Sequence, residues 1–256
     1  MTAPGILWFR QDLRLRDNPA LDAALAHAES QGGGLLLLYI LDDETPSAWR
    51  IGGAGRWWLH HSLKALAAAV ASRGGRLILR RGAAEKLLDE IVAASGAETV
   101  FWNRCYEPWA IGRDKAIKAK LRKDGLSARS FNGALLMEPW QLATKSGTPY
   151  QVFTPFWRRL RDEVTIDRPT PAPKCLPPDD GRIASDDLAA LELLPRAPDW
   201  SSGLGDRWTP GENTALDRLE DFLDEDLAAY DRERDRPATD RTSRLSPHLH
   251  WGEISP

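Results

Sequence analysis

The sequence predicts an α/β fold in the first half of the chain, then a long connector, then the start of a helical domain. Three observations lead to this prediction: short apolar runs alternate with amphipathic stretches, prolines crowd the middle of the chain, and a helical apolar period begins near Gly211. Alternating strands and helices give a parallel sheet that helices cover on both faces through right-handed crossovers. We therefore expect an α/β domain over residues 1–131, a connector over 132–205 and the beginning of a helical domain over 206–256.

Each element of the first half is assigned from its apolar pattern, with short continuous runs as buried strands and amphipathic stretches as helices. Ligands of parallel sheets bind beyond the carboxyl ends of the strands, so residues 10–14, 42–43 and 103–107 are expected to gather there. The expected strands are Gly5–Phe9, Gly34–Leu41, Arg76–Leu79, Thr99–Trp102 and Ser127–Phe131, and the expected helices are Pro19–Glu29, Ala54–Ser72, Ala83–Ala94 and Pro108–Lys123.

The glycines before the second expected helix do not form a nucleotide-binding fingerprint. Gly52–Gly55 follows a polar loop rather than a strand, and the chain contains no G-x-G-x-x-G or Walker sequence, which disfavours a dehydrogenase. We interpret these glycines as a flexible lead into the helix, with a phosphate cradle as the alternative. His60 and His61 are adjacent and would point about 100° apart on a helix, so we expect no metal site there.

Composition sets limits without deciding function. The 256 residues can bury a sizeable core, and the net charge of -3 means that any contact with nucleic acid must be a local basic patch. Cys105 and Cys175 are too few for a disulfide framework and lack metal-ligand spacing, which fits a reducing cytosol and predicts a cytoplasmic protein. The longest apolar run, Leu35–Leu41, has the length of a strand, so we expect no membrane partner.

The connector is expected to be extended. Prolines between Pro169 and Pro198 fix φ and remove hydrogen-bond donors, which favours a crossover along the surface. The aromatic stretch before it, Tyr150–Leu160, fits either packing between domains, which we favour, or a stacking platform for nucleic acid.

The last part of the chain shows helical periodicity and then a run of hydroxyl side chains. Apolar residues from Leu216 to Tyr230 recur at i, i+3 and i+4, which predicts a helix with one buried face and Tyr230 in its last turn. The run Thr242–Ser246 combines three hydroxyls with a guanidinium at an expected helix start. Such a group suits an anion, although a simple Ser or Thr N-cap is the alternative.

Three motifs give the chain a family resemblance. They are Trp8–Leu21, which reads WFRQDLRLRDNPAL, then Tyr230–Pro237, and then Thr242–Ser246. Together they resemble the N-terminal portion of the DNA photolyase and cryptochrome family, in the same order and at close to the expected spacing. The resemblance implies a Rossmann-like α/β antenna domain, a long connector and the first helices of an incomplete all-α FAD-binding domain.

The resemblance also implies cofactors and the residues that hold them. FAD would be bound by Tyr230, Thr242, Ser243, Arg244, Leu245 and Ser246, and Arg234 would contact DNA phosphate. A light-harvesting antenna chromophore, a folate or a deazaflavin, would lie beside Glu107 and Trp109. One folate-binding pattern of the family has Asn-Glu where this chain has Trp109–Ala110, so the pigment stays undecided. Trp109 would either stack on a flat pigment or fasten its helix to the sheet.

The function that the resemblance implies is light-dependent repair of cyclobutane pyrimidine dimers in UV-damaged DNA by electron transfer from reduced FAD. Relatives carry the dimer-binding pocket beyond the point that corresponds to Pro256, so we expect no catalytic residue in this segment, no activity of the segment alone, and a monomer at full length. Two alternatives remain: a cryptochrome-type blue-light photoreceptor, and a non-catalytic nucleotide- or pigment-binding module.

Overall fold

The α/β half of the chain forms the expected parallel sheet. The computed structural model describes residues 2–144, 146–179 and 181–256. The sheet has five strands in the order β3-β2-β1-β4-β5, and all neighbouring strands are parallel. The strands are β1 (Gly5–Phe9), β2 (Leu35–Leu41), β3 (Leu77–Arg81), β4 (Thr99–Asn103) and β5 (Ser127–Phe131).

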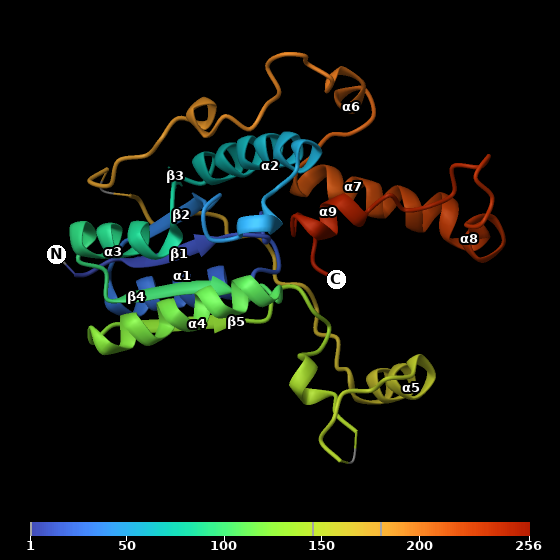
Figure 1. Cartoon of the computed structure of the whole chain (residues 1–256), viewed down its shortest axis with the longest axis horizontal. Coiled ribbons are helices and arrows are strands. Elements are labelled where there is room, and N and C mark those ends of the chain that lie inside the picture. Colours follow the sequence, from blue (N-terminus) through green and yellow to red (C-terminus); the bar gives the residue numbers. More distant parts are fainter. Residues whose placement is uncertain (1, 145, 180) are drawn as a thin grey trace.

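Four helices cover the two faces of this sheet (Figure 1). One core cluster joins α1 and α2 to one face, and a second joins α3 and α4 to the other. The side chain of Asn18 caps α1, because its Oδ1 accepts the amide of Leu21 at 3.1 Å. The helices are α1 (Pro19–Gln31), α2 (Gly53–Ala71), α3 (Ala84–Ser95) and α4 (Pro108–Lys123), each within two residues of the expected bounds.

One strand differs from the prediction in its burial. β1, β2 and β4 are buried at every position, whereas Ser127 and Arg129 of β5 are exposed. The reason is position, since β5 lies at the edge of the sheet and pairs only with β4. The Arg129 guanidinium lies over the rings of Phe101 and Phe131, 5.3 and 5.6 Å from their centroids, and covers part of their apolar surface.

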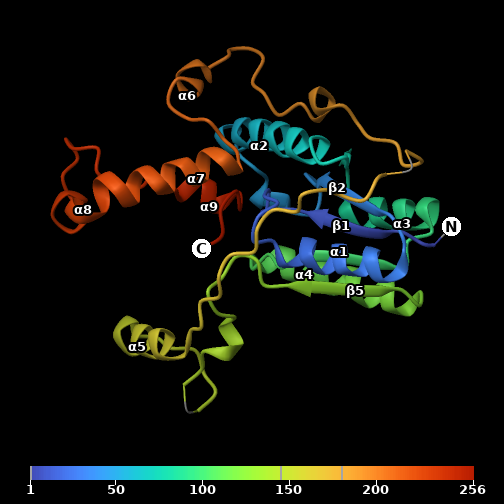
Figure 2. The same ribbon diagram turned by 180° about the vertical axis from the view of Figure 1, so that it is seen from behind.

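The connector is extended, as predicted, and part of it is fastened to the sheet. The amide of Leu79 in β3 donates to Ser185 Oγ at 3.0 Å, and the amide of Asp186 donates back to the Leu79 carbonyl at 2.8 Å. Figure 2 shows this segment running along the sheet and α2. Its short helices are η2 (Pro139–Gln141), α5 (Phe153–Glu163), η3 (Leu188–Leu191) and α6 (Ser202–Gly205).

The aromatic stretch that we expected to pack between domains is exposed. α5 stands apart from the sheet in Figure 1 and has no buried residue. Phe153 is 71% exposed and Trp157 is 46% exposed, and their rings stack on each other with centroids 6.3 Å apart.

The helical region extends away from the α/β unit (Figure 1). It contains α7 (Glu212–Asp221), a π turn (Phe222–Asp226), α8 (Leu227–Glu233) and α9 (Ser246–His250). The expected buried stripe is therefore wrong in its second half, where Leu223 and Leu227 are each 50% exposed. α7 contacts α2, and its buried residue is Ala215, near its start. Across the described ranges, no helix is long and apolar enough to cross a membrane.

Candidate functional site

A pocket of about 440 Å³ lies beyond the carboxyl ends of the strands. Arg10 follows β1, Asp42 follows β2 and Glu107 follows β4, so the gathering predicted from the sheet topology is confirmed. The first turn of α2 forms another wall, and Trp251 from the C-terminal segment closes a further side. We call this the strand-end pocket.

Arginine and tryptophan side chains build one wall of the strand-end pocket. Arg10 donates to Asp114 at 2.6 Å, and Arg113 donates to the same carboxylate at 3.0 Å. The guanidinium of Arg113 lies between two rings, 4.8 Å from the centroid of Trp8 and 4.9 Å from that of Trp109. Trp109 therefore lines the pocket, where a flat ligand could lie against its ring.

Several buried polar atoms of this pocket lack partners. Within the described chain, neither Glu107 Oε2 nor Arg10 Nε has a hydrogen-bond partner. Among the described residues Trp8 Nε1 lacks a partner as well, and buried polar atoms are normally paired, so one acceptor and two donors here are available to a ligand. Burial also raises the pKa of the Cys105 thiol in the pocket wall, which keeps it protonated near neutral pH.

The glycines before α2 are not the flexible lead that we expected. Gly52 is the N-cap of α2, and Gly53 and Gly55 belong to its first turn. A Cβ on Gly55 would lie 2.9 Å from the Ile51 side chain, so the close packing favours glycine. Gly52 and Gly55 line the strand-end pocket, which places the positive end of the α2 dipole at its wall.

The hydroxyl run lies elsewhere, against α7. Thr242 and Ser243 line a groove of about 160 Å³ together with Arg218. Three carboxylates also line it, and they oppose a bound anion unless other groups offset their charge. The groove is therefore an incomplete anion site within this chain. The carboxylates belong to Asp217, Asp221 and Asp226.

The other three residues of the hydroxyl run, Arg244–Ser246, differ in burial and in their contacts. Leu245 is buried and is the N-cap residue of α9, with no side-chain cap, so the simple Ser or Thr N-cap interpretation is wrong. Ser246 begins α9 and is exposed. Arg244 has a left-handed backbone with φ of 52° and pairs with Asp240.

Phe222, in the π turn, lies between two of the residues predicted to bind FAD, Tyr230 and Thr242. The ring of Phe222 lies 5.5 Å from that of Tyr230, and Phe222 also lines the groove with Thr242. Arg234 is an exposed side chain at the end of α8, with its guanidinium 5.7 Å from the Tyr230 ring and 3.8 Å from Asp235. By contrast, the two residues predicted to lie beside the antenna pigment, Glu107 and Trp109, line the strand-end pocket.

A buried polar network joins the loop after β1 to β4, and no local sequence pattern pointed to it. Asn103 Nδ2 donates to Asp12 Oδ2 at 2.6 Å and to Asn18 Oδ1 at 2.7 Å. The partners lie 85 or more positions apart in sequence, so only the motif around Trp8–Leu21 could have signalled the network.

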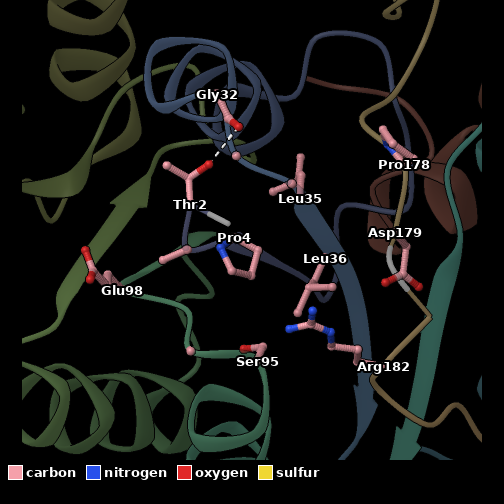
Figure 3. A pocket seen from close by; sticks show the side chains of 14 residues that line it. Thr2, Pro4, Gly32, Leu35, Leu36, Ser95, Glu98, Pro178, Asp179 and Arg182 are labelled. Carbon is pink, nitrogen blue, oxygen red and sulfur yellow. Dashed lines mark hydrogen bonds between the residues drawn. The ribbon is translucent and has the colours of Figure 1, made fainter.

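A second, larger hollow of about 750 Å³ lies at the amino ends of the strands (Figure 3). Thr2 donates to the Gly32 carbonyl across it at 2.8 Å, and Asp179 is engaged by Arg76. Because sheets of this type bind ligands at the opposite edge, the strand-end pocket is the stronger candidate. Among the described residues, no group of three His, Cys, Asp or Glu side chains could hold a metal ion.

Known proteins resemble this chain over its whole length. A family model described as DNA photolyase matches residues 5–175. A deoxyribodipyrimidine photo-lyase of Agrobacterium fabrum is 51% identical and matches 100% of this chain and 52% of its own length. Cryptochrome-1 of Arabidopsis thaliana is 35% identical over 98% of this chain and 36% of its own length. A crystal structure of a class III photolyase from Agrobacterium tumefaciens superimposes with a TM-score of 0.92 at 50% identity, covering 99% of this chain and 51% of that one. The chain spans about half the length of this Agrobacterium fabrum photo-lyase.

Proposed function

The chain belongs to the DNA photolyase family, and we propose from this premise that it is part of a flavin-dependent enzyme that repairs pyrimidine dimers in UV-damaged DNA under light. The observation that carries the proposal is the 51% identity, across the whole chain, to a deoxyribodipyrimidine photo-lyase. The lesion that we propose is the cyclobutane dimer, which the family resemblance implies.

We assign FAD binding to Tyr230 and Thr242–Ser246. Within the described chain, no hydrogen bond engages the hydroxyls of Thr242 and Ser246, so both are available as donors to a pyrophosphate. The carboxylates of the groove have to be offset by positive or donor groups from outside the described residues. When bound and reduced, FAD supplies the electron that splits the dimer. Arg234 is exposed, and its surface pair with Asp235 is weak enough to give way to a DNA phosphate.

The strand-end pocket is the proposed antenna site. Its features fit a flat, partly polar pigment: the Trp109 ring, the unpaired Glu107 Oε2 and the unpaired Arg10 Nε. Glu107 would accept a hydrogen bond from a ring N–H of the pigment, and Arg10 would donate one to a pigment oxygen or nitrogen. These features are compatible with both a folate and a deazaflavin.

A cryptochrome-type photoreceptor is the second candidate, because the match to Cryptochrome-1 of Arabidopsis thaliana covers 98% of this chain. The lower identity, 35% against 51%, ranks it behind repair. A free-standing binding module is not supported, since α7 and α8 leave the α/β unit and expose Leu223 and Leu227.

The test uses an extended protein, in which this chain is followed by the part of the Agrobacterium fabrum photo-lyase that the chain does not match. In this protein Thr242→Ala with Ser246→Ala should weaken FAD retention about a hundredfold, because two hydrogen bonds to a charged group contribute about 3 kcal/mol. The control is Ser146→Ala with Thr148→Ala, which removes two exposed hydroxyls from the connector. Unchanged flavin absorption after gel filtration of the first variant would contradict the assignment.

A further inference from the structure

A buried guanidinium, that of Arg14, joins three segments that lie far apart in sequence. Arg14 is only 2% exposed. Its Nη1 donates to the Gly252 carbonyl at 3.0 Å, and its Nη2 donates to the Gly133 carbonyl at 2.8 Å. Nε and Nη2 also donate to the carbonyl of Asp17, at 3.1 and 2.8 Å. Arg14 thus links the loop after β1, the start of the connector and the C-terminal segment.

The hydrogen bonds of Arg14 suit a rigid link between these chain segments. All of its hydrogen-bond acceptors in the described chain are backbone carbonyls. Burial lowers the pKa of the guanidinium, and three nearby carboxylates oppose that effect. Arginine remains charged in proteins and presents its donors as a rigid planar fork, so its bonds are strong and directional. The fork therefore fixes how the three segments lie relative to one another.

The C-terminal segment is held at three successive residues, Trp251–Glu253, which we call the strap. The Trp251 carbonyl accepts the amide of Leu13 at 3.1 Å, and the Gly252 carbonyl accepts Arg14. The Glu253 carboxylate is fully buried, with Oε1 accepting Trp58 Nε1 at 3.2 Å and Ser62 Oγ as well. The strap is thereby bonded both to the loop after β1 and to α2.

The strap lies between the two candidate cofactor sites. The side chain of Trp251 lines the strand-end pocket. The strap also follows α9 directly, and the first residue of α9 is Ser246, the last member of the hydroxyl run. Because α9 is only five residues long, the position of the strap determines where the end of the hydroxyl run lies relative to the pocket.

We propose that Arg14 is a positioning residue that fixes the candidate FAD segment relative to the candidate antenna pocket, and so governs how efficiently excitation passes from pigment to flavin. This inference rests on the proposed function. The efficiency of excitation transfer depends on the separation and orientation of the pigment and the flavin. A strap that is held less firmly therefore lowers this efficiency even when both groups are bound.

The first test follows amide hydrogen exchange in this chain. In Arg14→Gln, the Leu13 amide and the amides of residues 248–253 should exchange about tenfold faster or more, because a charge-assisted bond that holds the strap is lost. The matched control is Arg16→Gln, which removes the same charge from an exposed side chain of the same loop. Equal exchange at the strap in the two variants would overturn the proposal.

The second test uses the extended protein and compares repair driven by light absorbed by the pigment with repair driven by light absorbed by the flavin. The ratio should fall in Arg14→Gln and stay at the wild-type value in Arg16→Gln. Arg14→Lys keeps the charge but lacks the fork, so its ratio should fall as well, and a wild-type ratio in either Arg14 variant would overturn the proposal. If the extended protein binds no flavin even without a substitution, that result counts against the proposed function. The exchange experiment on this chain would then still decide the role of Arg14.

Discussion

Replacing Gly252 by alanine tests the strap most severely. Gly252 has a φ of +62°, a conformation that L side chains rarely adopt. A Cβ at this position would lie 2.1 Å from the Gln11 carbonyl oxygen and 2.6 Å from the Asp12 Cα. Both are backbone atoms next to β1, so neither can rotate away as the end of a side chain could. The strap itself must move.

The expected loss of stability is the sum of the backbone strain at Gly252 and the hydrogen bonds that this movement breaks. The left-handed conformation alone costs an alanine about 1–2 kcal/mol. Displacement of the strap also removes the bond from the Leu13 amide to the Trp251 carbonyl and the bond from Arg14 to the Gly252 carbonyl. A neutral bond contributes about 1 kcal/mol and a charged one about 1.5–3 kcal/mol. Gly252→Ala should therefore lower the free energy of unfolding by about 3.5–6 kcal/mol.

Gly96→Ala is the matched control for this prediction. Gly96 ends α3 with a φ of +68°, and a Cβ there would meet nothing within 4 Å. This variant carries the conformational cost without the steric overlap, so about 1–2 kcal/mol is expected. Urea unfolding followed by far-ultraviolet circular dichroism measures both. If Gly252→Ala costs no more than Gly96→Ala, the close contact between the strap and the loop after β1 is refuted.

Three further predictions concern the strand-end pocket and its surroundings. In the extended protein, Trp109→Ala should lower the occupancy of the pigment that absorbs in the near ultraviolet. The control is Trp140→Ala, which removes an exposed ring outside the pocket and should leave the occupancy unchanged. Equal loss of pigment in both variants would contradict the antenna assignment. Cys105 should react with a thiol reagent more slowly than the exposed Cys175 near neutral pH, because burial raises the Cys105 pKa and withholds the thiolate, and equal rates found by mass spectrometry would contradict this. Burial, with its bond to a carboxylate, raises the pKa of Tyr106 to about 12, so its stabilising contribution is complete below about pH 10 and is lost as the pH rises through about 12. Tyr106→Phe should therefore weaken the alkaline fall in stability, and an identical pH profile would refute that.

The sheet was predictable because its strands are simple in sequence. β2 is a continuous apolar run that is buried on both faces, and β1 and β4 behave in the same way. β5 was misjudged because its sequence, SARSF, does not reveal that it lies at the edge. The strand-end pocket followed from topology, since parallel strands deliver their carboxyl ends to one edge.

The joint around Arg14 could not be predicted from local pattern. Its acceptors are backbone carbonyls, which any residue provides, and Gly133 and Gly252 lie 119 and 238 positions away in sequence. The environment of α7 and α8 could not be predicted from the sequence either. The periodicity from Leu216 to Tyr230 indicates an apolar face, but it does not say that the face is left exposed by the rest of this chain.

The most direct test of the central claim is a repair assay on the extended protein with reduced flavin bound. UV-irradiated DNA is mixed with the protein, and cyclobutane dimers are counted by mass spectrometry after illumination and after the same time in the dark. Our account predicts that the dimers disappear under light and persist in the dark. A protein that binds and photoreduces its flavin but leaves the dimer content unchanged under light would contradict repair and favour the photoreceptor.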